Sequence, residues 1–473
     1  MLNQWISVKM TAENTASFSI PFEWEQGAAS HLMIHVNMLQ EVWLQYQIID
    51  ANQEVRAQFV SGKTIQPVVV SHTSQSTSPN TISGPLPKGD WTLQVQVAGK
   101  EIAHTEVATI KLIETNEASK AEYGVSWTKD NGQFLLEQFP WSKASEQTKR
   151  WYKGDFHTHT IASDGQMTRE ENLISAKAQG LDFFVATDHN LVPTSWCASE
   201  QIRVIPGIEI TAKAGHFNIL GAKEYPFVDF DVAAMETEGG MNAILNKSRE
   251  AGSLNSINHP FLTIWKWLFK DTPLELIDTF EIWNDPTYID NAQATEHALE
   301  AWDLLTNDGW RLTGIGGSDS HLRPEDHYPE SEQPSLIGDP GTFVWSESNS
   351  AEALLRNVKK GHVFVTRENL QIDFDAEGQR AGSQLTTAVG IARVTLDSDE
   401  PLVIQWVEKG EVIRESSGIK DTFEFQWDEH TYSWLRLTIR KQDGTLVGFT
   451  NPVYFGERTP SLHTWGDVLE RLG

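Results

Sequence analysis

The chain has 473 residues and a mass of 53.2 kDa, which at roughly 100–200 residues per domain predicts two to four domains. Its 37 basic and 65 acidic residues give a net charge of −28 with histidine neutral. Such a surface repels nucleic-acid phosphates and argues against a general nucleic-acid binder. The single cysteine, Cys197, excludes disulfides within one chain and thiolate clusters, so a metal site here must be built from histidine and carboxylate.

No segment is suited to cross a membrane or to direct secretion. No apolar run approaches the ~20 residues that a membrane span needs. The first residues, MLNQWISVKM, lack both the basic start and the apolar stretch of a secretory signal. We therefore expect a cytoplasmic location and no membrane partner.

Residues 1–115 are typical of β-structure. Short apolar or alternating runs are separated by turn-rich stretches such as SHTSQSTSPNTISG at 71–84. This spacing predicts a β-sandwich. A polar connection follows at 115–150, so we place a first domain at 1–148. The predicted strands are FSIPF (18–22), LMIHV (32–36), VWLQYQII (42–49), WTLQVQV (91–97) and VATIKLI (107–113).

Strand-like and helix-like runs alternate from residue 149 to residue 368. The run 168–180 has a capping box, with Glu171 three residues after Thr168, and ends at a glycine. This alternation predicts an α/β fold, either a barrel of parallel strands or a layered sheet. The predicted strands are 181–187, 202–210, 253–258, 279–283, 312–317 and 362–366, and the other predicted helices are 239–252, 291–305 and 350–361.

Helix-like patterns stop at residue 369. The remaining runs predict a second small β-sandwich at 369–473. Its predicted strands are ARVTLD (392–397), LVIQWVEKG (402–410), TFEFQW (422–427), WLRLTIR (434–440) and NPVYF (451–455).

The negative charge is concentrated in the central segment. Residues 151–340 carry 12 basic and 30 acidic groups, a net charge of −18, whereas residues 1–150 contribute −4 and residues 341–473 contribute −6. A solvated acidic surface explains most such segments. The alternative is that some of these carboxylates bind divalent cations.

Five polar clusters of the central segment lie at or just beyond the ends of predicted strands. In barrel enzymes such strand ends converge on the active site, and converging imidazoles and carboxylates suit borderline divalent metals. Each cluster alone is a common pattern, but five in the same phase of successive β–α units indicate a metal site. The clusters are His157-Thr158-His159 with Asp164; Asp188-His189; Glu209 with His216; His259; and Asp319-Ser320-His321.

These motifs, in this order, resemble those of the PHP family, named for polymerase and histidinol phosphatase. The resemblance covers residues 150–366, and KGDFHTHTIASDG, GHFNILG, GGSDSH and the tail GFTNPVYF are most similar to its carbaryl-hydrolase-like branch. It implies a distorted (β/α)7 barrel holding two or three divalent metals (Mn²⁺, Zn²⁺ or Fe²⁺), here flanked by N- and C-terminal β-sandwiches. Asp164 stands where some members have histidine, and a carboxylate is still a competent ligand.

The resemblance also implies a ligand scheme in which Glu209 bridges two metals. Imidazole ligands need hydrogen-bond partners that orient them. Asp155 and Asp188 lie beside predicted ligands and are candidates for that role, although a salt bridge or turn contact would explain them equally well. The implied sites are His157, His159, Glu209 and Asp319; Glu209, His216 and His259; and Asp164, His189 and His321.

The mechanism that follows is hydrolysis by a hydroxide held between metals, because two cations make water more acidic. Asp319 is the expected proton acceptor. Either His321, His327 or Arg323 assists the leaving group, and the sequence does not choose among them. Two other histidines are less suited: His297 lies in a helical run, and His362 begins a strand.

Substrate signals are few. The segment FLTIWKWLFKDTP (261–273) is either a helix that packs its aromatic rings into the core or a lid that covers the pocket, and Trp283 is a further candidate beside the site. A phosphoesterase acting on a small phosphorylated molecule is the leading hypothesis. The alternatives are an ester, carbamate or amide hydrolase on the same centre, a 3'-5' exonuclease, and a non-catalytic binding protein. The oligomeric state stays open.

Overall fold

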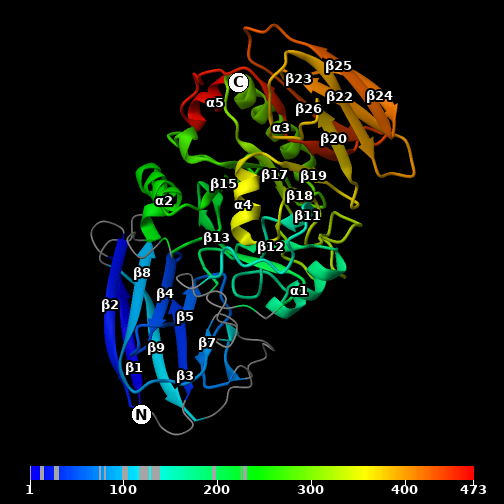
Figure 1. The fold of residues 1–473 in the computed structure, drawn as a ribbon. Coiled ribbons are helices and arrows are strands. Elements are labelled where there is room, and N and C mark those ends of the chain that lie inside the picture. The colour runs from blue at the N-terminus through cyan, green and yellow to red at the C-terminus, as the bar shows by residue number, and fades with distance from the viewer. Residues whose placement is uncertain are drawn as a thin grey trace.

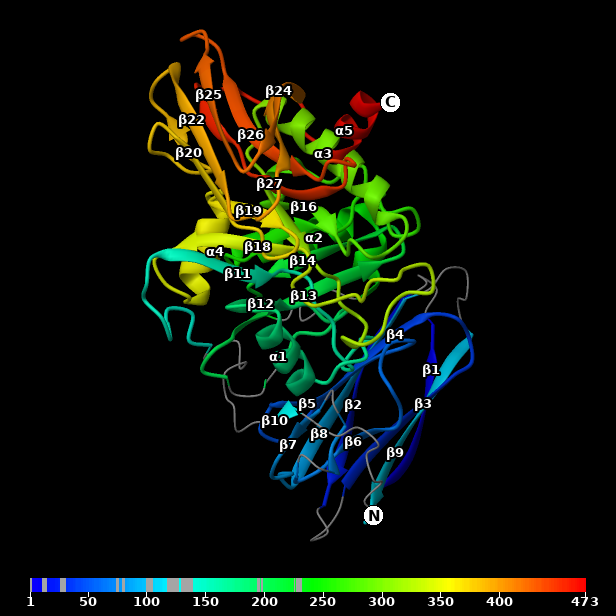
Figure 2. The same ribbon diagram turned by 90° about the vertical axis from the view of Figure 1, so that its right-hand side faces the viewer.

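The computed structural model contains three parts that follow one another along the chain (Figure 1). Both views place the central part between an N-terminal and a C-terminal β-rich part (Figures 1 and 2). Cys197 and most of the polar connection expected at 115–150 lie outside the described residues. The structure describes residues 2–10, 15–25, 31–73, 76–78, 81–98, 105–116, 127–128, 139–193, 196, 199–224, 226 and 232–473.

The N-terminal part consists of two four-stranded antiparallel sheets that share one apolar core. Period-2 alternation builds it: in β3 (His31–Met38), Leu32, Ile34 and Val36 are buried while their neighbours are less so. The predicted β-sandwich is present. One sheet has the order β1 (Asn3–Lys9), β9 (Glu106–Thr115), β3, β6 (Val68–Val70), and the other β2 (Thr15–Trp24), β8 (Gly89–Ala98), β4 (Trp43–Ile49), β5 (Val55–Val60); a small parallel pair joins β7 (Ile82–Ser83) to β10 (Trp127–Thr128).

The central part contains a run of seven neighbouring strands, β11 to β17, in chain order. Beyond the ends of this run, Thr158 after β11 and Ser320 after β17 form a single parallel bridge. The strands are β11 (Arg150–Asp155), β12 (Phe183–Ala186), β13 (Arg203–Ala212), β14 (Gly215–Leu220), β15 (Leu254–Ile257), β16 (Thr279–Asn284) and β17 (Thr313–Gly317).

The expectation of uniformly parallel strands was wrong at one position in this run. Strands β11 to β13 are parallel, and so are β15 to β17, but β14 is antiparallel to both of its neighbours. A tight turn joins β13 directly to β14, and such a hairpin needs no crossover helix. The β–α pattern of the sequence therefore gave no sign of β14.

Four helices accompany the central strands. The capping box of α1 (Arg169–Ala178) is confirmed: Thr168 accepts a bond from the Glu171 amide, and the Glu171 carboxylate accepts one from the Thr168 amide at 2.7 Å. The other predicted helices are also present. They are α2 (Glu238–Glu250), α3 (Asn291–Asp308) and α4 (Ala351–Lys359), and short 3₁₀ turns occur at Val232–Glu236 and Leu274–Leu276.

Most of the C-terminal strands continue the central sheet, and the others form a sheet of their own. β18 (Gly341–Ser346) pairs with β11, β19 (Val363–Thr366) pairs with β18, and β27 pairs with β19, all antiparallel. A separate three-stranded sheet, β20-β22-β25, shares an apolar core with the continued sheet. The domain boundaries at 148/149 and 368/369 stay predictions. The C-terminal strands are β20 (Ile372–Ala376), β21 (Gln384–Leu385), β22 (Val389–Leu396), β23 (Leu402–Glu408), β24 (Glu411–Gly418), β25 (Lys420–Gln426), β26 (Ser433–Arg440), β27 (Leu446–Thr450) and β28 (Val453–Phe455).

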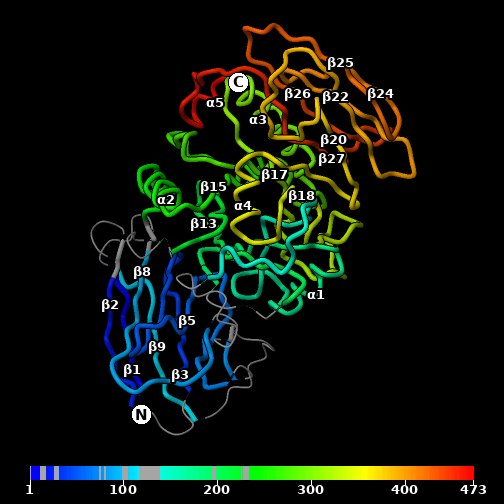
Figure 3. The backbone as a smooth tube through the Cα atoms, in the orientation of Figure 1, coloured from blue at the N-terminus to red at the C-terminus, as the bar shows by residue number. Residues whose placement is uncertain are grey.

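The chain ends in a helix that the sequence patterns did not predict. α5 (Trp465–Leu472) returns to the central part and lies beside α3 (Figures 1 and 2). Trp465 is completely buried there, and its indole donates to the Trp267 carbonyl at 3.1 Å. The two chain termini lie at opposite ends of the molecule (Figure 3). No helix among the described residues is long and apolar enough to cross a membrane.

Candidate metal centre

All nine predicted metal ligands lie together at one edge of the central strands. Most follow a parallel strand at its C-terminal end, where such ends meet. His216 instead begins β14. Because β14 runs antiparallel, its first residues lie at this same edge, opposite the end of β13. The strand reversal therefore completes the cluster.

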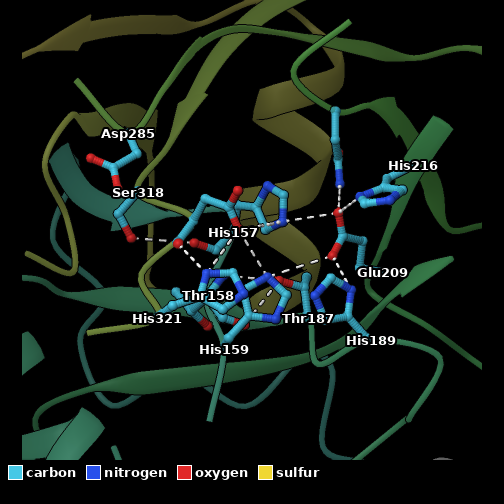
Figure 4. Close-up of polar contacts among 12 residues, drawn as sticks. His157, Thr158, His159, Thr187, His189, Glu209, His216, Asp285, Ser318 and His321 are labelled. Carbon is cyan, nitrogen blue, oxygen red and sulfur yellow. Dashed lines mark hydrogen bonds and ion pairs between the residues drawn. The ribbon is translucent and has the colours of Figure 1, made fainter. Parts of the chain in front are cut away.

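Glu209 is the central carboxylate of the cluster (Figure 4). Its Oε1 lies 3.2 Å from Nε2 of His157 and 3.1 Å from Nδ1 of His216, while its Oε2 lies 2.7 Å from Nδ1 of His189. Oε1 also accepts a hydrogen bond from the Asn258 amide at 2.9 Å. Nε2 of His259 is 3.6 Å from Oε1. The two oxygens of Glu209 thus face different groups of imidazoles.

Asp319 and Asp164 complete the acidic part of the cluster. Oδ1 of Asp319 lies 3.2 Å from Nε2 of His157 and 3.0 Å from Nε2 of His159. Oδ1 of Asp164 lies 3.2 Å from Nε2 of His189 and 3.3 Å from Nε2 of His321. Each carboxylate therefore faces at least two imidazole nitrogens.

Three overlapping groups of these side chains bring their ligand atoms within 4.8 Å of one another, close enough to hold a metal ion. The first group is the implied first site without Glu209. The second group is the implied second site with His157 in place of His216. The third adds His159 to the implied third site. The groups are His157, His159 and Asp319; His157, Glu209 and His259; and His159, Asp164, His189 and His321.

The donor atoms of this cluster fit metal ions better than they fit one another. Nε2 of His157, both ring nitrogens of His159, Oδ1 of Asp164 and Oε2 of Glu209 are buried without a hydrogen-bond partner among the described residues. Carboxylate oxygens of Glu209 and Asp319 lie 3.0 to 3.5 Å from Nε2 of His157 and of His159. Buried polar atoms are ordinarily satisfied, so this convergence of unsatisfied lone pairs is what a cation-binding site requires.

Burial and neighbouring charges lower the pKa of some imidazoles in the cluster and raise the pKa of others. Burial, together with the neighbouring imidazoles of His321 and His189, lowers the pKa of His159 to about 3. Burial also lowers the pKa of His216 to about 4, against the attraction of Glu209. At His189 burial is outweighed by Glu209 and Asp164, which raise its pKa to about 9. His159 and His216 are therefore neutral near pH 7, the form in which imidazole binds a metal.

The acidic partners are held ionised. Burial disfavours the charged carboxylates of Glu209 and Asp319, but the surrounding histidines outweigh it and lower both pKa values well below the ordinary range. The carboxylates are therefore available as metal ligands at neutral pH.

Two of the predicted ligands have strained backbone. His259 and Asp319 adopt φ values of 29° and 49°, a region that residues with a side chain rarely occupy. The Glu281 carboxylate accepts a hydrogen bond from the His259 amide at 2.7 Å, and the His157 carbonyl accepts one from the Asp319 amide at 2.9 Å. Strain of this kind is retained where a function needs the side chain in place.

The sequence interpretation missed Glu281 of β16. Its Oε1 lies 2.9 Å from Nδ1 of His157, and its Oε2 accepts the His259 amide. Glu281 is 2 % exposed. It orients one predicted ligand through its ring and another through its backbone. The sequence contains a pattern that could have identified Glu281. This acidic residue interrupts the apolar strand TFEIW, as Glu209 interrupts GIEIT.

Of the two interpretations of Asp155 and Asp188, the contacts favour the turn contact over the orientation of an imidazole. Asp155 accepts hydrogen bonds from the amides of His157, Ser318 and Gly338. Asp188 accepts bonds from the backbone and side chains of the loop that follows His159. Both carboxylates therefore hold the loops that carry the ligands. The Thr211 hydroxyl lies 2.5 Å from Nδ1 of His189, the nitrogen that also faces Glu209.

A pocket of about 210 Å³ opens onto the candidate centre. One wall is apolar and includes Leu262, Trp265, Tyr288 and Tyr328, with the Trp265 and Tyr288 rings 6.1 Å apart. The helix considered for 261–273 is wrong, because no residue of that segment is helical.

The three tryptophans considered near the pocket have different positions. Trp265 lines it, as the lid interpretation expects of its segment, and Trp267 is buried in the core. Trp283 is buried and is not a lining residue.

Of the three residues considered for leaving-group assistance, only His321 lines the pocket. Arg323 points away, with its Nη1 3.0 Å from the Glu171 carboxylate. His327 is exposed, and its Nδ1 contacts the Tyr328 carbonyl at 2.9 Å. Asp319, the expected proton acceptor, also lines the pocket, and its side chain is 18 % exposed.

No family model and no curated protein matches the sequence. Among solved structures, the chain is similar to a two-domain protein from Bacteroides vulgatus ATCC 8482 described as containing a predicted PHP-like metal-dependent phosphoesterase. The identity is 17%, the similarity covers 64% of this chain and 96% of that one, and the TM-score is 0.38.

Two further structures give lower TM-scores. A glycosyl hydrolase family 2 member from Bacteroides cellulosilyticus shows 10% identity over 96% of this chain and 78% of that one, with a TM-score of 0.16. A beta-glucuronidase of the same family shows 11% identity over 97% and 50%, with a TM-score of 0.15. Similarities this low decide neither fold nor function, so we argue the function from the chain's own residues.

Proposed function

We propose that this chain is a metal-dependent hydrolase, and specifically a phosphoesterase that acts on a small phosphorylated molecule. The observation that carries the proposal is the buried cluster of imidazoles and carboxylates with unsatisfied, converging donor atoms. The order of the motifs along the chain, which is similar to that of the PHP family, supports the same class. We also infer that β11 to β17 form the distorted (β/α)7 barrel of that family; the order of the strands and the bridge between Thr158 and Ser320 support this.

We assign two or three divalent cations (Mn²⁺, Zn²⁺ or Fe²⁺) to this cluster. Once bound, such cations supply Lewis acidity, which makes water a better nucleophile and neutralises charge on the substrate. Glu209 would bridge the first two sites, because its Oε1 lies 3.2 Å from Nε2 of His157 and 3.1 Å from Nδ1 of His216. The assigned ligands are His157, His159, Glu209 and Asp319; Glu209, His216 and His259; and Asp164, His189 and His321.

The chain's own residues move the protons of the reaction. A water oxygen forms a bond to phosphorus while the bond from phosphorus to the leaving-group oxygen breaks. The water must lose a proton, and Asp319 is placed to accept it because it is ionised and lines the pocket. The leaving-group oxygen must gain one. His321 lines the same pocket and would supply that proton when the third site holds no metal, because a metal-bound imidazole nitrogen has no proton to donate.

An ester, carbamate or amide hydrolase is the second candidate. The apolar wall of Leu262, Trp265 and Tyr288 favours it, because such a wall binds a neutral carbonyl substrate without needing a charge. The similarity to the carbaryl-hydrolase-like branch points in the same direction. A 3'-5' exonuclease is disfavoured by the acidic central segment, which repels a nucleic-acid backbone.

Elemental analysis of the purified protein, followed by assays with added Mn²⁺ or Zn²⁺, tests the proposal. The substrates are aryl phosphate mono- and diesters, with aryl acetates and carbamates in parallel. We expect bound metal, turnover of a phosphate ester, and a loss in kcat of about 100-fold or more in Asp319→Asn. Glu325→Gln, an exposed acid in the same loop, is the matched control. Metal-free protein, or no phosphate ester hydrolysed with any metal, would refute the proposal.

A further inference from the structure

The pocket at the candidate metal centre contains one cationic side chain that does not belong to the central part. Of the described residues that line it, Lys63 is the only lysine or arginine, and it comes from the N-terminal β-sandwich. Its ammonium forms an ion pair with Oδ2 of Asp164, whose Oδ1 faces His189 and His321. We propose that Lys63 binds the anionic group of the substrate, so that the N-terminal sandwich forms part of the active site and selects phosphate monoesters over neutral esters.

A tight turn holds Lys63 in place. After β5 the chain turns at Gly62, whose φ of 76° favours glycine. The amide of Thr64 donates to the Val60 carbonyl at 3.0 Å, and the Thr64 hydroxyl accepts from the Val60 amide at 3.0 Å. The same hydroxyl lies 3.5 Å from the carbonyl of Ala162, two residues before Asp164. The turn is thus tied both to its own strand and to the ligand loop.

Further buried contacts hold the N-terminal sandwich against the central part. The amide of Gln58, a residue only 1 % exposed, donates to the Val192 carbonyl at 3.2 Å. A small apolar cluster crosses the same contact, with Val60 and Ile82 from the sandwich and Ala162 and Leu191 from the central part. Buried polar and apolar contacts together give Lys63 a defined position above the pocket.

The charges of the pocket explain what Lys63 can contribute. Four of the lining residues are acidic: Asp164, Glu209, Asp285 and Asp319. An anionic substrate needs cations to offset these carboxylates, and an ammonium group offers a positive charge with three hydrogen-bond donors. The Lys63 side chain forms an ion pair with Asp164 and is 26 % exposed. It is therefore held in place and still accessible to a substrate.

This inference rests on the proposed function, since it names the substrate class of the same site. A dianionic monoester gains more from Lys63 than a monoanionic diester does, and a neutral ester gains nothing. Lys63 is thus a specificity determinant carried by the flanking sandwich.

The test compares Lys63→Met, Lys63→Gln and Lys63→Arg in the full-length protein as purified with its metals. Lys88→Met is the control, because it removes the same charge from an exposed position of the same sandwich. Lys88 lies at the opposite end of it, where the neighbouring Gly89 approaches Ala51. We expect KM for an aryl phosphate monoester to rise about 10- to 100-fold in the Met and Gln variants, which corresponds to the loss of a charged hydrogen bond. We expect KM for an aryl acetate to stay unchanged in all three variants. In Lys63→Arg we expect KM for the monoester to stay close to that of the wild type, because the positive charge is kept.

Three results would overturn the inference. They are an unchanged KM for the monoester, an equal loss for the neutral ester, and a fall in bound metal in Lys63→Met, which would mean that Lys63 only orients Asp164. Calorimetric binding of inorganic phosphate separates this inference from the proposed function. If the wild type hydrolyses no phosphate ester, the proposed function fails, and weaker phosphate binding by Lys63→Met still supports the role of Lys63.

Discussion

At the scale of single residues, the candidate metal centre depends on carboxylates that serve different purposes. Glu209 faces imidazoles on both sides. Glu281 lies behind the cluster and holds His157 and His259 from outside. Asp155 and Asp188 hold backbone and hydroxyl groups of the loops that carry the predicted ligands. Chemically identical side chains thus have separate roles because each has different neighbours.

Glu281→Gln tests the orienting role of that carboxylate. The change keeps the size of the side chain but removes the charge that holds the His157 ring at 2.9 Å. Substitution of such an outer partner typically costs about 10- to 100-fold in metal affinity or activity. We expect a loss of this size, measured by titration of the chelator-treated protein with Zn²⁺ or Mn²⁺. Unchanged metal affinity would contradict the assignment.

Gly317→Ala tests the space that Glu281 occupies. A Cβ on Gly317 would lie 2.5 Å from Oε1 of Glu281 and 2.5 Å from Cβ of His157. We expect the free energy of unfolding to fall by roughly 1–3 kcal/mol, as in other overpacked cores, and activity to fall with it. Gly239→Ala, where a Cβ meets nothing within 4 Å, is the control in denaturant unfolding. Equal free energies of unfolding for the two variants would contradict the prediction, because they would mean that the site shifts to make room for the Cβ.

At the scale of elements, two features decide the shape of the site. The hairpin of β13 and β14 brings His216 to the ligand edge. The segment 261–273 follows β15 and supplies the apolar wall of the pocket through Leu262 and Trp265. Helix α5 packs against this segment, where Trp465 donates to the Trp267 carbonyl. The last helix of the chain therefore supports the wall of a distant pocket.

Trp465→Ala tests this support. Removing a completely buried tryptophan should lower the free energy of unfolding by about 3–5 kcal/mol. Because the segment that forms the apolar wall of the pocket would lose its contact with α5, we also expect a higher KM with a smaller change in kcat. Trp406→Ala is the control, since Trp406 is equally buried but belongs to the C-terminal core. A rise in KM of the same size in both variants would mean that general destabilisation is the cause.

At the scale of the whole molecule, the negative charge and the candidate centre are connected. The central segment contributes −18 of the total −28, and three of its carboxylates, Asp164, Glu209 and Asp319, lie in the cluster. Bound cations would reduce the repulsion among these groups and satisfy their unpaired oxygens.

Metal removal is therefore expected to destabilise the protein. A ligand present at 100 to 1,000 times its Kd adds about 3–4 kcal/mol to the stability of the folded state. We expect Tm to fall by at least about 5 °C after treatment with a chelator, and to recover when Mn²⁺ or Zn²⁺ is restored. In scanning calorimetry His159→Ala should show a smaller dependence on the metal. The same Tm with and without metal would argue against an occupied centre.

The sequence alone determined the class of the site and most elements of the central part. The five clusters identified the side chains that converge in the structure, because imidazoles and carboxylates at strand ends are visible as local motifs. The helices were visible through their caps and periodicity. Only the tertiary structure decided the antiparallel β14, the continuation of the central sheet into the C-terminal strands, the place of α5, and the contacts of Glu281 and Lys63. These depend on which distant segments pack together: Lys63 and Asp164 are 101 residues apart in the chain. No local pattern records such a contact, because it arises from long-range packing.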